Sequence, residues 1–126
     1  MNENIVNNIE EDIKEKTARI AMEMVINAGD ARNLIMQAFD SVTALNFEEA
    51  KIKLKYAQSK IHEAHKYQTE VIQSEASGEY FEYSILFTHA QDTLMTICTE
   101  LNLARKICSI SENIDARIKN LEENRE

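Results

Sequence analysis

The residues of this chain best suited to chemistry are its histidines and an aspartate close to one of them. His89 and Asp92 stand three positions apart, so on a helix they lie on the same side. An accessible, neutral imidazole is a nucleophile, and a carboxylate is a ligand for hard cations. His89 is therefore a candidate nucleophile; the alternative interpretation is a helix histidine with a structural role only.

A second pair, His62 and His65, has the same spacing and is compatible with two metal ligands. A zinc site needs more ligands than two, so a solvated or partly packed pair is the better interpretation. Glu63 stands at the wrong spacing for the Glu-x-x-His motif of metal-storing helical bundles. Cys98 and Cys108 lie ten residues apart, which is ~15 Å along a helix, so free thiols are expected.

Composition limits the architecture that can carry these residues. A chain of 126 residues fits one domain, 1–126, and its zero prolines and two glycines leave little turn chemistry for a β fold. The net charge of -8 argues against nucleic acid and anionic membranes as partners. The acidic N-terminus and the absence of an apolar run of ~18 residues predict a cytoplasmic protein without membrane insertion.

Three segments repeat apolar residues at alternating steps of three and four, the pattern of helices packed at shallow angles. The repeats are Ile20, Met24, Asn27, Ala31, Leu34, Ala38 and Val42; Phe47, Ala50, Leu54, Ala57, Ile61, Ala64, Gln68 and Val71; and Phe87, Ala90, Leu94, Ile97, Leu101, Ala104 and Cys108. Short connections make neighbours antiparallel. We therefore predict an all-α fold, an antiparallel bundle of three helices of ~30 residues each.

Local signals place the ends of these helices. Asn46 with Glu49 resembles a capping box and begins the second helix, Gly78 suits the position after its end, and Ser84 caps the third. Gly29 lies inside the first helix, where glycine is unfavourable, and we expect a neighbouring backbone to approach it closely.

The two ends of the chain and the entry to the third helix give weaker signals. Residues 1–14 and 120–126 are charged, and fraying is expected there. The aromatic residues before and within the start of the third helix are expected to form a lid or staple over the core. They are Tyr80, Phe81, Tyr83 and Phe87.

The third helix has a second face that lacks the Lys and Glu of a solvated surface. Around Asp92 this face carries Ile85, Thr88, His89, Met95, Thr96, Thr99 and Leu103. A single three-helix chain has nowhere to bury it, so self-association about this helix is expected. Asp92 carboxylates brought together at an axis would share protons or bind a divalent ion such as Mg²⁺. The alternative is that Asp92 points to water.

The window His89-Ala90-Gln91-Asp92-Thr93-Leu94-Met95-Thr96 resembles the active-site signature of the lactose/cellobiose-type enzyme IIA of the bacterial phosphoenolpyruvate sugar phosphotransferase system. Ala28-Gly29-Asp30-Ala31-Arg32 is similar to that family's first-helix motif. Glu63-Ala64-His65, followed by Gln68-Thr69, is similar to its second-helix motif. The likeness covers roughly residues 16–115.

The resemblance implies a trimer of three-helix subunits, a nine-helix bundle with the site in a shallow crevice between subunits. His89 would be phosphorylated by the phosphocarrier protein HPr and would pass the phosphoryl group to a cysteine of the cognate IIB component. Gln91 would be a polar neighbour of the phosphorylated ring. Asp92 would lie at the trimer axis, where the family can hold a metal ion.

One position departs from the family pattern. Thr93 stands where a second histidine is usual, which puts in doubt any role of that imidazole in tuning the pKa of His89. The sugar stays open among lactose, cellobiose and chitobiose, because the membrane component selects it. The competing hypothesis is a non-catalytic helical adaptor, which would carry no covalent phosphate.

Overall fold

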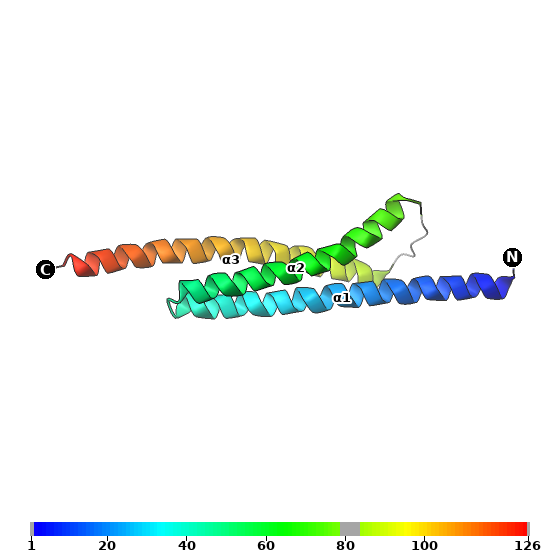
Figure 1. Ribbon diagram of the computed structural model, residues 1–126, viewed down its shortest axis with the longest axis horizontal. Helices are drawn as coiled ribbons and strands as arrows, with labels where there is room; N and C mark the ends of the chain where they lie inside the picture. Colours follow the sequence, from blue (N-terminus) through cyan, green and yellow to red (C-terminus); the bar gives the residue numbers. More distant parts are fainter. Residues whose placement is uncertain (1, 79–83, 126) are drawn as a thin grey trace.

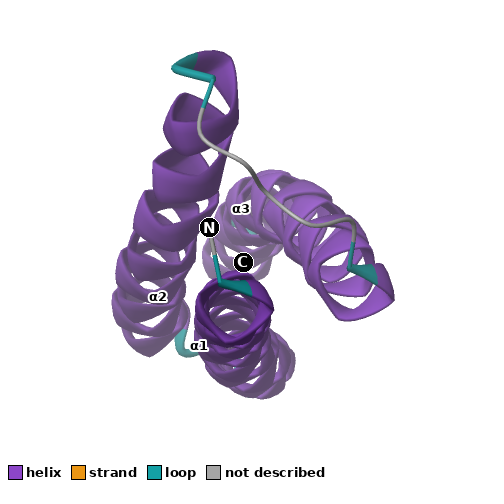
Figure 2. Ribbon diagram, turned by 90° about the vertical axis from the view of Figure 1, so that its right-hand side faces the viewer, coloured by secondary structure: helices purple, strands orange, loops and turns teal. Residues whose placement is uncertain are grey.

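The computed structural model describes residues 2–78 and 84–125, which form three helices and no strand. They are α1 (Glu3–Thr43), α2 (Phe47–Ala76) and α3 (Ile85–Glu123). α1 and α3 run in the same direction and α2 runs against both (Figure 1). Seen end-on, the three helices are grouped around a shared centre, and α2 diverges from the others toward its C-terminal end (Figure 2). The predicted all-α, three-helix architecture is confirmed.

The helix boundaries follow the local capping signals. The Asn46 side chain accepts a hydrogen bond from the Glu49 backbone N–H at 3.2 Å, and its amide donates to the Glu49 carboxylate at 2.9 Å. Ser84 accepts from the Phe87 N–H at 3.2 Å. Gly78 follows the end of α2 with φ of 86°, the left-handed conformation that glycine adopts without strain. The predicted caps are therefore confirmed.

The core is built largely from alanine, which lets the three helices approach closely. Buried alanines face the centre from every helix: Ala21, Ala28, Ala31, Ala38, Ala50, Ala57, Ala64, Ala90 and Ala104. The larger fully buried side chains between them are Met24, Ile35, Leu94 and Ile97. The repeats predicted for the second and third helices coincide with this core, except that Gln68 and Phe87 are only half-buried.

The predicted core of the first helix was partly wrong. Asn27, Leu34 and Val42 are only half-buried, whereas the neighbouring Ala28 and Ile35 are fully buried. The core positions of α1 follow steps of four and three: Thr17, Ala21, Met24, Ala28, Ala31, Ile35 and Ala38. The alanines of α1 face the centre together with Met24 and Ile35, whereas Leu34 and Val42 lie at its edge.

The expectation for Gly29 was also wrong within the chain. A Cβ atom added to Gly29 would meet no heavy atom within 4 Å. The backbone of α2 or α3 therefore does not require glycine at this position.

The two terminal segments, for which fraying is expected, are helical in the structure. α1 begins at Glu3, where Asn2 accepts from the Asn4 N–H at 3.3 Å, and α3 continues to Glu123. Proline is absent from the chain, so neither terminal segment contains a residue that would stop the helix. The two helices overhang the bundle at opposite ends (Figure 1). The aromatic lid expected at Tyr80, Phe81 and Tyr83 falls outside the described residues.

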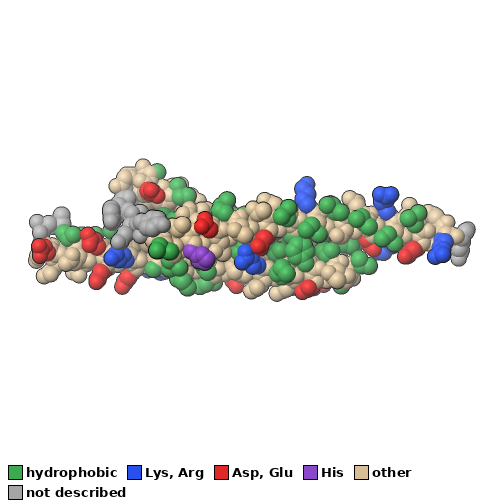
Figure 3. All heavy atoms as spheres, turned by 180° about the vertical axis from the view of Figure 1, so that it is seen from behind, with side chains coloured by type: hydrophobic (Ala, Val, Ile, Leu, Met, Phe, Trp, Pro, Cys, Tyr) green, Lys and Arg blue, Asp and Glu red, His purple; other side chains and the backbone are tan. Residues whose placement is uncertain are grey.

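A continuous line of positions on α3 is left uncovered by α1 and α2. Its members repeat at steps of three, four and four, an eleven-residue period. We refer to them as the α3 stripe: Ile85, Thr88, Asp92, Thr96, Thr99, Leu103, Ile107, Ile110, Ile114, Ile118 and Leu121. All are exposed except Thr88, which is half-buried. Hydrophobic side chains are spread over the half of the molecule that carries the C-terminal part of α3 (Figure 3, right).

No helix in the described ranges is both long and apolar enough to cross a membrane.

Candidate functional site

His89 lies in the second turn of α3, on a helix start that is firmly held. Ser84 caps the first turn of α3, and the Thr88 hydroxyl donates to the Ser84 carbonyl at 3.1 Å. The next residue, Ala90, is fully buried in the core, whereas the His89 side chain is exposed. The backbone below the imidazole is thus anchored while the ring is accessible to a docking partner, as a nucleophile requires.

Asp92 is exposed one turn further along α3, on the same side as His89. The Thr96 hydroxyl donates a hydrogen bond to the backbone carbonyl of Asp92 at 2.8 Å, so this bond does not involve the Asp92 carboxylate. Beyond it, on the flank of α3 that faces α1, Glu100 and Arg32 form a two-pronged ion pair with distances of 2.8 and 3.1 Å. This contact with Glu100 raises the pKa of Arg32. The ion pair joins α1 to α3 beside the site.

Gln91 points away from His89. Two residues on a helix are separated by ~200°, so the two side chains lie on opposite flanks of the α3 stripe. Gln91 is half-buried toward α2, where its Oε1 accepts from Gln68 Nε2 at 3.2 Å. The structure thus brings His89 and Asp92 to one surface and places Gln91 at the α2–α3 contact.

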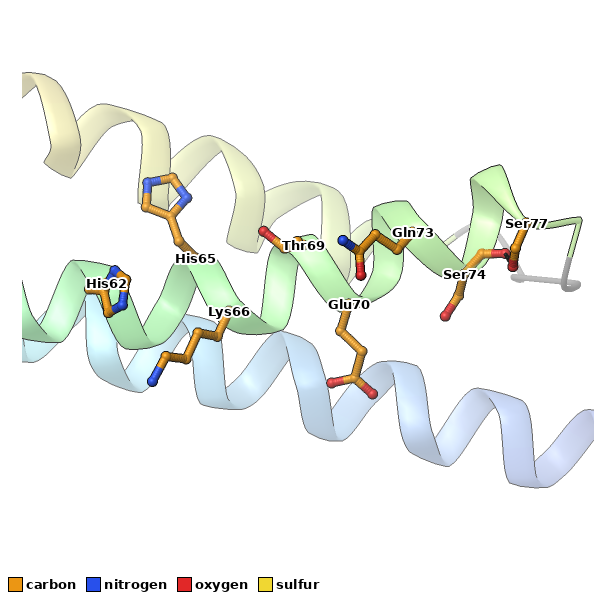
Figure 4. A pocket seen from close by; sticks show the side chains of 8 residues that line it. All are labelled: His62, His65, Lys66, Thr69, Glu70, Gln73, Ser74 and Ser77. Carbon is orange, nitrogen blue, oxygen red and sulfur yellow. Dashed lines mark hydrogen bonds between the residues drawn. The ribbon is translucent and has the colours of Figure 1, made fainter.

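His62 and His65 have different surroundings. His62 is exposed, whereas His65 is half-buried and directed toward α3 (Figure 4). Both ring nitrogens of His65 have partners: Nδ1 lies 3.1 Å from Gln68 Oε1, and Nε2 lies 3.4 Å from Cys98 Sγ. Burial raises the pKa of the Cys98 thiol. His65 therefore packs at the contact between α2 and α3, which the residue spacing had not predicted.

A hollow on the surface runs along α2 and does not include His89. It has a volume of about 580 Å³ and is lined by His62, His65, Lys66, Thr69, Glu70, Gln73, Ser74 and Ser77. Seven of the eight lining residues lie on α2 and Ser77 directly follows its end, and Glu70 is directed toward α1 (Figure 4). The hollow is open and is lined from one side only, so it lacks the enclosing walls of a small-molecule pocket.

The sequence model of the family described as "PTS system, Lactose/Cellobiose specific IIA subunit" matches residues 19–112. The chain belongs to this family. The match contains His89, Gln91 and Asp92, and it leaves both overhanging helix ends outside.

Individual relatives agree with this assignment. The chain is 36% identical over 102 residues to the lichenan-specific phosphotransferase enzyme IIA component of Bacillus subtilis, covering 81% of this chain and 93% of that protein. It is 34% identical to the lactose-specific EIIA component of Lacticaseibacillus casei, over 86% of this chain and 94% of the relative.

Solved structures agree as well. The cellobiose-specific enzyme IIA of Bacillus anthracis superposes with a TM-score of 0.74 at 38% identity, covering 78% of this chain and 90% of that one. PtcA of S. mutans gives 0.73 at 30% identity over 89% and 99% of the two chains. The protein is therefore a phosphocarrier component of a sugar phosphotransferase system.

Proposed function

We propose that His89 is the residue that carries the phosphoryl group, accepting it from HPr and passing it to a cysteine of the cognate IIB component. The observation that carries this proposal is the exposed imidazole on an anchored turn of α3, inside the segment matched by the family. The reaction would serve uptake of a disaccharide of the lactose, cellobiose or chitobiose type.

The chemistry requires an unprotonated ring nitrogen. In the first step this nitrogen supplies the electron pair for a new N–P bond while the bond from phosphorus to the donor breaks. In the second step the IIB sulfur forms an S–P bond, and the pair of electrons returns to His89. Each step needs positioning of two docked proteins and little other machinery. An exposed histidine suits this relay better than a closed pocket, which would hold the phosphoryl group too firmly.

The site is proposed to be completed by assembly of three chains along the α3 stripe. An eleven-residue repeat corresponds to 3.67 residues per turn, so the stripe follows the helix with little supercoiling. From Leu103 onward its six members are all leucine or isoleucine, between 43% and 73% exposed in the single chain. Isoleucine-rich seams favour three or four helices over two. A homotrimer would cover them.

In such a ring each contact joins one flank of α3 to the opposite flank of the next copy. His89 and Gln91 occupy these opposite flanks, so the Gln91 of a neighbouring copy is the one that would face His89. This places the supporting role of Gln91 between chains, where the half-buried amide becomes a donor to the phosphoryl group.

Asp92 lies on the α3 stripe itself, so its three copies would meet at the axis. Three carboxylates supply the oxygen ligands that Mg²⁺ prefers, and the neighbouring threonine hydroxyls are compatible with such a site. A bound ion would neutralise the clustered charge there. The phosphoryl transfer steps above do not involve it.

The test is intact mass after incubation with phosphoenolpyruvate, enzyme I and HPr. The expected result is one acid-labile phosphoryl adduct per chain, lost in His89→Ala and retained in His62→Ala, which removes an exposed histidine elsewhere. The B. anthracis IIA in a parallel reaction shows that the donors are competent. No adduct on this chain alongside a phosphorylated control, or an adduct that survives in His89→Ala, would contradict the proposal and favour a non-catalytic adaptor.

A further inference from the structure

A run of hydrogen bonds joins α2 to α3 and ends on Gln91. Cys98 Sγ lies 3.4 Å from His65 Nε2, and His65 Nδ1 lies 3.1 Å from Gln68 Oε1. Gln68 Nε2 then donates to Gln91 Oε1 at 3.2 Å. All four side chains are half-buried, so each contact is partly shielded from competing water.

The chemistry of these groups fixes the direction of every bond in the run. Gln68 Oε1 is only an acceptor, so His65 Nδ1 must carry a hydrogen and donate it. In the neutral ring Nε2 is then bare, and it accepts from the Cys98 thiol. Burial raises the pKa of that thiol and keeps it protonated at neutral pH, so the S–H donor is available.

The last link determines which end of the Gln91 amide can bind a ligand. Its Oε1 is occupied by Gln68 Nε2, which leaves its own Nε2, a group that can only donate. A donor is what an anionic phosphoryl group requires, whereas an amide turned the other way would present a repelling oxygen. The two ends of the Gln91 amide have nearly the same shape, so this series of hydrogen bonds decides its orientation and leaves Nε2 available to a ligand.

We propose that Gln68, supported by His65 and Cys98, is a positioning residue that holds the Gln91 amide with Nε2 toward the phosphorylated His89 of a neighbouring copy. This inference rests on the proposed function, because it presupposes His89 as the phosphoryl carrier.

The direction of the run can be tested without any phosphoryl transfer. The ¹⁵N chemical shifts of His65 in the intact protein are expected to show a protonated Nδ1 and a bare Nε2. Gln68→Met, which removes the acceptor, is expected to return the ring to the Nε2–H form usual for neutral imidazoles in water. A parent protein already in the Nε2–H form would overturn the inference.

The effect on the reaction is tested with Gln68→Glu, which has the same shape and still accepts from His65 but cannot donate to Gln91. Phosphoryl transfer from HPr is expected to slow about tenfold, less than the ~100-fold typical of deleting a charge-stabilising donor. Gln73→Glu, at an exposed position further along α2, adds the same charge and is the matched control.

A double-mutant cycle separates positioning from general damage. If Gln68 acts through Gln91, then Gln68→Glu costs nothing further in a Gln91→Ala background. Additive losses, or a Gln68→Glu rate equal to that of the parent and of Gln73→Glu, would overturn the inference. If the parent chain takes up no phosphoryl group at all, the proposed function has failed instead, and the NMR result still decides the direction of the run.

Discussion

From Thr88 to Thr99 the α3 stripe carries three threonines and Asp92, whereas from Leu103 to Leu121 it carries only leucine and isoleucine. The eleven-residue spacing is unbroken from one half to the other. The polar half is also the half beside His89, and the apolar half extends past the end of the family match at residue 112.

This difference indicates a division of labour along one helix. Covering a half-exposed leucine or isoleucine contributes roughly 1 kcal/mol, so the six in the apolar half would supply most of the free energy of the proposed association. Threonine hydroxyls supply little such drive, because they can hydrogen-bond within their own helix, as Thr96 and Thr99 do. In the proposed trimer the polar half would thus keep water and charge near His89, while the apolar half would hold the copies together.

The largest effect should come from breaking the apolar half. Ile110 and Ile114 are 57% and 52% exposed in the single chain, so Ile110→Asp with Ile114→Asp should leave the three-helix core folded. Charges placed in a shared seam cannot be desolvated without cost, and we expect complete dissociation at micromolar concentration. Sedimentation measures this as a fall from the mass of three chains to that of one.

Ile52→Asp is the matched control for that double variant. Ile52 is 53% exposed on α2, on the side away from the core, and lies outside the α3 stripe. The Ile52→Asp variant should retain the mass that the parent protein shows by sedimentation. A parent chain that sediments as a monomer, or a double variant that keeps the mass of three chains, would remove the basis for the division of labour.

An intermediate effect of opposite sign is expected in the polar half. Asp92→Leu replaces clustered carboxylates with apolar contacts, so the dissociation constant should fall about tenfold, or ~1.4 kcal/mol. Asp92→Asn, which removes only the charge, should fall between the parent and Asp92→Leu. Any stabilisation of the parent by Mg²⁺ in thermal melts should disappear in Asp92→Leu. Weaker assembly of Asp92→Leu would show that the polar half contributes through bound cations rather than merely tolerating its charge.

The features that the sequence predicts well depend on a few neighbouring residues. Asn46 and Ser84 cap helices through contacts three positions away, and Gly78 ends one through its own φ. The exposed faces of His89 and Asp92 also follow from spacing on one helix. Each of these depends on local geometry, which the chain specifies without reference to its tertiary neighbours.

The features that the sequence predicts poorly depend on packing between helices. In α1 the core contains Ala28 and Ile35 instead of the predicted Asn27 and Leu34, which each lie one position earlier, because the packing of α1 against α2 and α3 sets which face of the helix turns inward. The contact of His65 with Cys98 depends on the register of α2 against α3, which is set by side chains along both helices. The signal available in the sequence was the polar pair His65 and Gln68 at i and i+3, with Gln68 at a position of the predicted apolar repeat.

The smallest expected effect is on the free energy of unfolding when either of the two glycines of the chain is replaced. These substitutions separate the stability of the fold from that of the assembly. Gly29 lies inside α1 with nothing within 4 Å of an added Cβ, so Gly29→Ala should raise the free energy of unfolding by ~1 kcal/mol through helix propensity alone. Gly78 has the same open surroundings but a φ of +86°, so Gly78→Ala should lower it by a similar amount. Chemical denaturation of both variants in the dissociated Ile110→Asp, Ile114→Asp background measures the fold without assembly. If Gly29→Ala stabilises that background but destabilises the parent, a neighbouring copy packs against α1 at Gly29, and the contact between copies extends beyond the α3 stripe.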